Sequence, residues 1–317
     1  MRFGMGLPGQ GESASPENQI KVVQKAEVLG FQYALIGDHI VIPKSFGSTY
    51  PYSQTGEFTS ATSGECLDQL MLLSFLAGST SSIRLVPSVM IVPHRNPIVA
   101  AKQLATLDVL SKGRLTLGVG AGWLKEEFDA LGIPPFERRG SVTNEYLDIF
   151  KELWSSDNPT FQGEYCSFSD IMFEPKPIQK PHPPIWIGGE SKPAMRRAAR
   201  YGTAWHPLNA NPRYPLTTAA QLETSITWLR NYSETLGRNP LNIDVSYRVS
   251  KHSIDPGNRK TTFTGTPNEI AEDIVEFKNL GVTDMIFDFR NDDITLMINL
   301  MELFAAEVIP LVRKALN

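Results

Sequence analysis

Hydrophobic residues alternate along the chain between a helix-like and a strand-like spacing. Four segments share the order of an amphipathic stretch, a glycine and a short apolar run, and they lie at residues 28–39, 111–122, 200–207 and 279–289. Glycine directly after a helix is typical of a C-terminal cap with positive φ. Runs that are apolar on both faces are typical of parallel strands buried between helices. The pattern therefore predicts repeated β–α units.

Further segments extend this rhythm to eight units. Additional strands are expected at residues 2–8, 84–92, 185–189 and 244–249. Helices are expected at residues 16–29 (with Ser15 as N-cap), 69–80, 97–111, 140–154, 191–201, 216–236, 267–280 and 294–315. Eight strands, each followed by a helix, predict a (β/α)8 TIM barrel, with a doubly wound sheet as the alternative. Even spacing and the absence of a Pro/Gly/Ser-rich linker predict a single domain over residues 1–317.

Long connections interrupt the regular spacing at four places. They follow the second, fourth and seventh strands, at residues 40–66, 123–139 and 250–265, and a further insertion at 158–184 precedes the fifth strand. The sequence FQGEYCSF in that insertion predicts a hairpin that turns at Gly163 and Glu164. Loops that follow strands lie on the C-terminal face of a TIM barrel, where active sites are built.

Composition narrows the function classes without selecting one. The 317 residues carry a net charge of −4, so no nucleic-acid partner is expected. Two cysteines and no apolar leader predict a reduced, cytoplasmic protein. The longest apolar stretch is expected at 85–92, far short of the roughly 20 residues that span a bilayer, so no membrane partner is expected. The five histidines are scattered, and no metal site is predicted.

Two glycine-rich strand ends are candidates for binding a phosphate-bearing cofactor. Gly188 and Gly189 end the fifth strand, and Ser191 follows as a potential N-cap. Bare backbone at a helix N-terminus binds phosphate well, although a plain turn is the alternative and the carboxylate of Glu190 would repel an anion unless it points away. GVGAGW, with Gly120 and Gly122, ends the fourth strand but lacks a third glycine of the GxGxxG fingerprint.

Polar and aromatic residues at other strand ends are candidates for catalysis and substrate binding. Asp38 and His39 end the second strand, and a histidine there is suited to proton transfer. Pro87 predicts a break at Ser88–Val89 in the third strand. Trp123, Trp205, His206 and Arg248 are candidate substrate residues, with core packing or surface charge as the alternatives. For His94 and Arg95, which begin the loop after the third strand, solvent exposure is expected, with contact to an anion as the alternative.

These motifs together resemble the luciferase-like monooxygenase superfamily, in particular its branch of coenzyme F420-dependent oxidoreductases. The segments that carry the resemblance are AEVLGFQYALIGDH, HRNPIVAAKQLATLDVLSKGRLTLGVGAGWLKEEFDALG and PPIWIGGESKPAMRRAARYG. The resemblance implies a luciferase-like barrel with the cofactor phosphate at Gly188, Gly189 and Ser191. It also implies a non-prolyl cis peptide at Ser88–Val89 behind the central ring.

The resemblance further implies that Asp38 contacts the ring system and that His39 takes part in catalysis. F420-dependent sugar-phosphate dehydrogenases of the superfamily have an acidic proton donor where this chain has Trp123, which argues against that reaction and leaves hydride transfer intact. The leading prediction is hydride transfer between F420 and an organic small molecule. The alternative is an FMN-dependent monooxygenase that uses O2 and receives reduced flavin from a partner reductase. A homodimer is expected.

Two alternatives from other classes are a lyase with Lys251 as Schiff base and a cofactor-binding protein without turnover.

Overall fold

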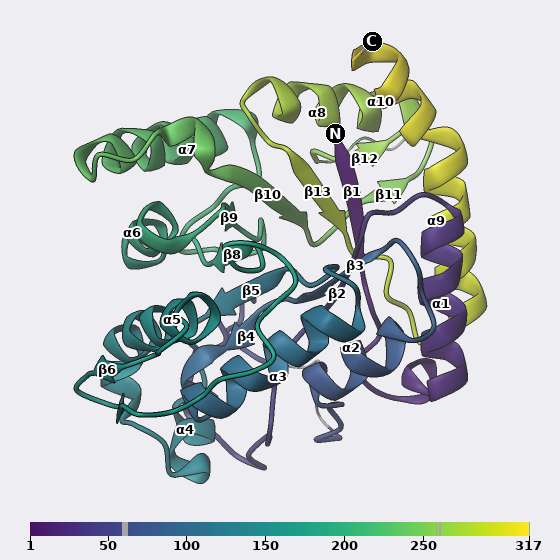
Figure 1. Cartoon of the computed structure of the whole chain (residues 1–317). Helices are drawn as coiled ribbons and strands as arrows, with labels where there is room; N and C mark the ends of the chain where they lie inside the picture. Colours follow the sequence, from purple (N-terminus) through teal and green to yellow (C-terminus); the bar gives the residue numbers. More distant parts are fainter. Residues whose placement is uncertain (59–62, 258, 260, 317) are drawn as a thin grey trace. The chain divides into compact units, whose positions relative to one another are not determined.

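A computed structural model describes residues 1–58, 63–257, 259 and 261–316, and within it the chain forms two compact units (Figure 1). Unit 1 comprises Met1–Leu35 and Trp186–Asn317, and unit 2 comprises Ile36–Ile185. The boundaries fall inside the strands β2 (Tyr33–Ile36) and β8 (Ile185–Gly188). The single domain over 1–317 stays a prediction.

Unit 1 is built on parallel strands in the order β2–β1–β13–β10–β9–β8. The strands not yet given are β1 (Arg2–Gly6), β9 (Ala204–His206), β10 (Asp244–Val249) and β13 (Asp284–Phe287). In the register of β1 and β13, Phe3 lies opposite Met285, and both are buried. Strands buried on both faces are what the uninterrupted apolar runs predicted.

The helices of unit 1 begin and end close to the predicted residues. They are α1 (Pro16–Val28), α6 (Lys192–Tyr201), α7 (Ala219–Thr235), α8 (Pro267–Asn279), α9 (Ile294–Glu307) and α10 (Ile309–Leu316). Ser15 caps α1 as predicted, and its side chain accepts from the N–H of Asn18. Two short parallel strands, β11 (Ser253–Ile254) and β12 (Thr264–Gly265), lie in the connection at 250–265.

The expectation that 85–92 is the longest apolar stretch is wrong, because the segment Ile294–Leu316 is longer and apolar. By length and composition this segment is apolar enough to cross a membrane. It forms α9 and α10, which meet at Val308, where one continuous helix was expected. Figure 1 shows α9 beside α1, and Met297, Met301 and Phe304 of α9 are buried. This side of α9 belongs to the core of unit 1.

Unit 2 contains the third and fourth predicted strands and four helices. The strands are β3 (Arg84–Pro87), β4 (Met90–Ile91) and β5 (Leu117–Gly120), and the helices are α2 (Gln69–Ala77), α3 (Pro97–Leu110), α4 (Lys125–Leu131) and α5 (Arg139–Ser155). β4 pairs in parallel with β5, and α3 packs against α2 and α5. Short 3-10 turns in the two units lie at η1 (Glu12–Ala14), η2 (Val92–His94), η3 (Phe136–Arg138) and η4 (Pro240–Asn242).

Local predictions in unit 2 are confirmed in part. The antiparallel pair β6 (Phe161–Gln162) and β7 (Ser167–Phe168) forms the predicted hairpin, and the N–H of Gly163 donates to the carbonyl of Cys166 across its turn. The strand expected at 84–92 is divided into β3 and β4 at Ser88–Val89, as Pro87 indicated. The connection 123–139 contains α4, which the sequence analysis did not predict.

Candidate functional site

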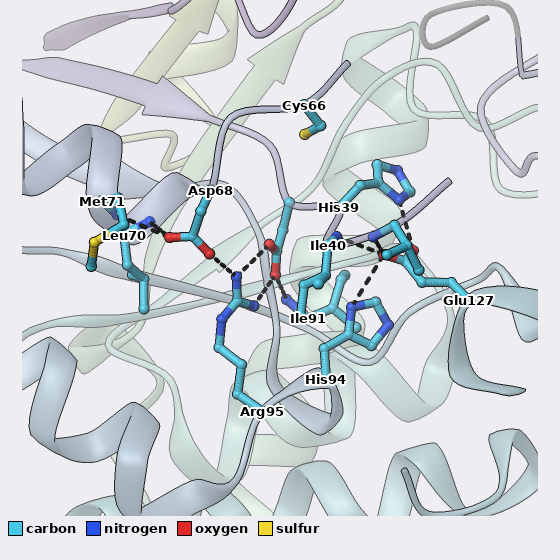
Figure 2. Close-up of polar contacts among 12 residues, drawn as sticks. His39, Ile40, Cys66, Asp68, Leu70, Met71, Ile91, His94, Arg95 and Glu127 are labelled. Atoms are coloured by element: carbon cyan, nitrogen blue, oxygen red, sulfur yellow. Dashed lines mark hydrogen bonds and ion pairs between the residues drawn. The ribbon is translucent and has the colours of Figure 1, made fainter. Parts of the chain in front are cut away.

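The carboxylate of Glu127, in the first turn of α4, lies at the centre of a buried polar cluster in unit 2 (Figure 2). Its Oε2 is 2.8 Å from Nδ1 of His39, and its Oε1 accepts from the N–H groups of Ile40 at 2.7 Å and Val41 at 3.3 Å. Nδ1 of His94 is 3.8 Å from Oε1, too long for a hydrogen bond. Glu127 is 1% exposed. We call Glu127, His39 and His94 the Glu127 cluster.

A second buried network, next to the first along the chain, holds Asp38. Both oxygens of Asp38 accept from the guanidinium of Arg95, at 2.7 and 2.9 Å, and Oδ2 also accepts from the N–H of Ile91 at 2.9 Å. Arg95 donates in addition to Asp68, which caps the N-terminus of α2. The Asp38 side chain is completely buried, so its carboxylate anchors the segment that follows the Ser88–Val89 bond. Contact of Asp38 with a cofactor stays a prediction.

Burial and hydrogen-bond partners together determine which side chains of the two networks are charged. Burial opposes ionisation of Glu127, but the hydrogen bond from His39, the nearby imidazoles and the backbone N–H of Ile40 together lower the pKa of its carboxyl. Burial lowers the pKa of His94, which keeps this imidazole neutral. Burial also opposes the charge on Arg95, yet its carboxylate partners Asp38 and Asp68 raise its pKa. The expected solvent exposure of His94 and Arg95 is therefore wrong.

Backbone geometry around β3 and β5 explains the glycine-rich sequence GVGAG. The peptide bond Ser88–Val89 is cis, as the resemblance implied. A Cβ at Gly118 would collide with the carbonyl oxygen of Pro87, and one at Gly120 would lie 2.5 Å from Cγ2 of Val89. Gly122 has φ of +90°, a conformation that favours glycine. Gly118 and Gly120 make room for the segment around Ser88–Val89. Cofactor contact at Gly120 and Gly122 stays a prediction.

Aromatic side chains from the connection 40–66 surround Trp123. The centroid of a Trp123 ring lies 5.1 Å from that of Tyr50, 5.2 Å from that of Phe58 and 6.3 Å from that of His39. Trp123 itself is half-buried. Glu126, next to Glu127, accepts from the N–H and hydroxyl of Ser48 and so fastens this connection to α4. An apolar wall therefore stands beside the ring of His39.

In unit 1 the end of β8 has the features of an anion site. Gly189 has φ of +100°, and the side chain of Ser191 caps α6 by accepting from the N–H of Ala194. Among the described residues the N–H of Ser191 makes no hydrogen bond to another backbone group. Glu190 is 6% exposed, and its two oxygens accept from the N–H of Leu208 and the side-chain amide of Asn211. Burial raises the pKa of Glu190, which weakens the repulsion expected from this residue.

The other unit 1 candidates are more buried than expected. Trp205 is fully buried, and its Nε1 donates to the carbonyl of Gly189 at 2.9 Å, so core packing, the stated alternative, describes it. His206 is 4% exposed, with Nδ1 2.7 Å from the carbonyl oxygen of Ser246. Arg248 lies 3.5 Å from a carboxylate oxygen of Asp288. Contact of Trp205, His206 and Arg248 with substrate stays a prediction. Lys251 is exposed and lacks the desolvation that activates a Schiff-base lysine.

Burial of His206 makes stability depend on pH. Burial, with a smaller contribution from Arg248, lowers the pKa of His206 to about 3. The unfolded chain binds a proton near pH 6.5 and the folded protein does not, so stability falls as the pH falls through this range. We expect the wild type to lose about 1.4 kcal/mol more unfolding free energy than His206→Gln between about pH 7.5 and about pH 5.5. Urea unfolding at the two pH values measures this, and equal losses would contradict it.

The structure gathers part of the predicted site in unit 2 and part in unit 1. His39, Asp38, Ser88, Val89, Gly120, Gly122 and Trp123 are in unit 2, and Gly188, Gly189, Ser191, Trp205, His206 and Arg248 are in unit 1. The sequence analysis missed Glu127 and the pairing of Arg95 with Asp38. The adjacent acids Glu126 and Glu127 were the available signal. Among the described residues no group of three or more His, Cys, Asp or Glu side chains is placed to hold a metal ion.

The chain is similar in sequence to known proteins over most of its length. A family model described as luciferase-like monooxygenase matches residues 1–226. An FMNH2-dependent dimethylsulfone monooxygenase of Pseudomonas putida is 27% identical over an alignment of 340 positions. This alignment covers 93% of this chain and 87% of the relative.

Solved structures agree over nearly the whole chain. The monooxygenase RslO1 from Streptomyces bottropensis matches with a TM-score of 0.74 at 19% identity, covering 98% of this chain and 99% of the other. The coenzyme F420-dependent tetrahydromethanopterin reductase from Methanopyrus kandleri matches with a TM-score of 0.72 at 18% identity, covering 98% of each chain. The predicted luciferase-like (β/α)8 TIM barrel is thereby confirmed, while its insertions after the second, fourth and seventh strands and before the fifth stay a prediction.

Proposed function

Because the chain belongs to the luciferase-like monooxygenase family, we propose that this enzyme transfers a hydride between coenzyme F420 and an organic small molecule. The observation that carries the proposal is the His39–Glu127 pair, at 2.8 Å and beside an aromatic wall. A histidine held by a buried carboxylate is suited to moving a proton, and a substrate that gains or loses a hydride also gains or loses a proton in most such reactions. The deazaflavin supplies the hydride chemistry.

The residues present fit such a cofactor at two places. The N–H of Ser191 at the start of α6 has the donor chemistry that binds a phosphate, and Gly189 places no side chain between its backbone and an anion. The backbone at Ser88–Val89, fixed on one side by Asp38 through Ile91, offers a rigid surface for a flat ring. In this proposal Gly188, Gly189 and Ser191 bind the phosphate. Ser88 and Val89 support the ring, and His39 exchanges the proton.

The second candidate is an FMN-dependent monooxygenase, favoured by the 27% identity to the FMNH2-dependent enzyme of P. putida. This reaction would consume O2 and require reduced flavin from a partner reductase. Trp123 and Arg248 are proposed to contact the substrate in either case. A homodimer and a cytoplasmic location also belong to the proposal.

Titration of the purified protein with F420 and with FMN tests the proposal. Binding is measured by fluorescence. We expect the dissociation constant of F420 to be at least tenfold below that of FMN. Preference for FMN, together with substrate-dependent O2 consumption when a flavin reductase is added, would move the assignment to the second candidate. Binding of neither cofactor would overturn both.

Gly189→Asp tests the phosphate site. A carboxylate at this position would repel a phosphate at the N-terminus of α6, so we expect cofactor affinity to fall about 10- to 100-fold. Gly189→Ala separates charge from conformation, because its Cβ would lie 3.1 Å from that of Ala194 without adding charge. We expect Ala to weaken binding less than Asp.

The matched control is Gly237→Asp, which adds the same charge at another glycine of positive φ, +68°, with open space around it. We expect its cofactor affinity to equal that of the wild type. An unchanged dissociation constant for a folded Gly189→Asp variant would refute the phosphate assignment.

A further inference from the structure

The orientation of the Glu127 carboxylate is fixed from two sides. Oε1 accepts from two consecutive backbone N–H groups, those of Ile40 and Val41, and this leaves Oε2 facing Nδ1 of His39. A backbone N–H can only donate, so the oxygen of Glu127 that faces Ile40 and Val41 must act as an acceptor. An ionised carboxylate only accepts hydrogen bonds. The nitrogen of His39 that faces it must therefore carry a hydrogen.

We propose that Glu127 is a positioning residue that holds neutral His39 in the tautomer with hydrogen on Nδ1, and so leaves Nε2 as the nitrogen that exchanges a proton with the substrate. The proposal rests on the proposed function for its chemistry, but not for its geometry. When the substrate loses a hydride to the cofactor, its proton passes to Nε2. The resulting imidazolium keeps its Nδ1–H bond to the carboxylate. In the reverse direction Nε2–H returns the proton.

His94 is placed beside Glu127 without competing for it. Neither ring nitrogen of His94 has a hydrogen-bond partner among the described residues, and its Nδ1 is 1.0 Å further from Glu127 than that of His39, at 3.8 against 2.8 Å. The His94 side chain is 2% exposed, and its ring meets Phe128 edge-on at 4.9 Å. His94 therefore does not hydrogen-bond the carboxylate, and His39 is its hydrogen-bonded side-chain partner.

The other titratable groups around the cluster are held by partners of their own. The charge of Asp38 is balanced by Arg95, which also binds Asp68. Glu126 accepts from Ser48, and Lys125 pairs with Asp129 at 2.6 Å. Burial raises the pKa of the Cys66 thiol, so this group is neutral. Glu127 is therefore the carboxylate that determines which nitrogen of His39 is protonated.

The tautomer of His39 can be read directly by nitrogen-15 NMR on protein labelled at its five histidines. His39→Gln assigns the signal of His39 by its disappearance. At a pH where His39 is neutral, we expect a protonated Nδ1 and an unprotonated Nε2 in the wild type. A wild-type His39 with hydrogen on Nε2 would overturn the proposal, and this measurement needs no variant of Glu127.

Glu127→Gln gives the complementary result. Its amide oxygen retains the bonds from Ile40 and Val41, and its NH2 group then faces Nδ1 of His39 as a donor. We expect the tautomer to reverse and kcat to fall about tenfold, with cofactor affinity and KM unchanged. Unaltered nitrogen shifts at His39 would contradict the proposal.

The matched control is Glu126→Gln, which makes the same change one residue away, where the carboxylate binds Ser48 and Gly47 instead of His39. We expect its His39 signals to match those of the wild type. If the wild-type tautomer is as expected but the protein binds neither F420 nor FMN, the positioning by Glu127 stands and the proposed function fails.

Discussion

Arg95→Met is expected to lower the free energy of unfolding by about 3–5 kcal/mol, because it leaves the carboxylate of Asp38 buried without its ion pair. The Asp38 side chain is completely buried, and two of its three hydrogen bonds come from Arg95. Only the N–H of Ile91 would remain, and the cost of an uncompensated buried charge exceeds that of most lost contacts. Urea unfolding at neutral pH measures the difference from the wild type.

Two further variants show whether charge burial is the cause. In the double variant Asp38→Asn/Arg95→Met the neutral amide still accepts from Ile91, so we expect recovery of about half of the loss. Lys125→Met removes an exposed i,i+4 pair with Asp129 and should change stability by no more than about 0.5 kcal/mol. A loss for Arg95→Met as small as that for Lys125→Met would refute a buried ion pair.

The sequence predicted the repeating elements because their signals are local. The runs that became β2 and β13 are apolar on both faces, which is typical of buried parallel strands. The caps of α1 and α6, Ser15 and Ser191, were readable because a capping side chain acts within three residues of its own position. Pro87 marked the division between β3 and β4 because proline cannot donate to a ladder.

The candidate site was less predictable because its partners come from distant segments. His39 and Glu127 are 88 positions apart, and Asp38 and Arg95 are 57 apart. α4 is seven residues long, too short for a clear helical period, so Glu127 was assigned to a loop. A charged residue is usually exposed, and this rule predicted Arg95 wrongly because a carboxylate partner reverses it. The glycines of GVGAG were predicted as a candidate cofactor contact, and their close approach to the segment around Ser88–Val89 was not predicted.

Loss of the His39 imidazole should slow turnover without weakening cofactor binding. In His39→Ala no group remains at the end of β2 to exchange the substrate proton, and positioned acid–base groups contribute about 10²–10⁴-fold to a rate. We therefore expect kcat to fall by about that factor, while the dissociation constant of the cofactor changes less than about threefold, since its contacts are proposed at other residues. Stopped-flow absorbance with saturating cofactor measures the first quantity, and equilibrium titration measures the second.

His39→Gln separates the proton from packing. Its amide can donate to Glu127 in place of Nδ1, so the buried carboxylate keeps a partner, yet an amide does not exchange a proton at neutral pH. We expect this variant to be as slow as His39→Ala and as stable as the wild type. His182→Ala, which removes a histidine of unit 2 whose Nδ1 lies 2.8 Å from the carbonyl oxygen of Pro183, should keep the full rate. Full turnover in either His39 variant would remove this residue from the mechanism, because hydride transfer would then proceed with a proton that the solvent supplies.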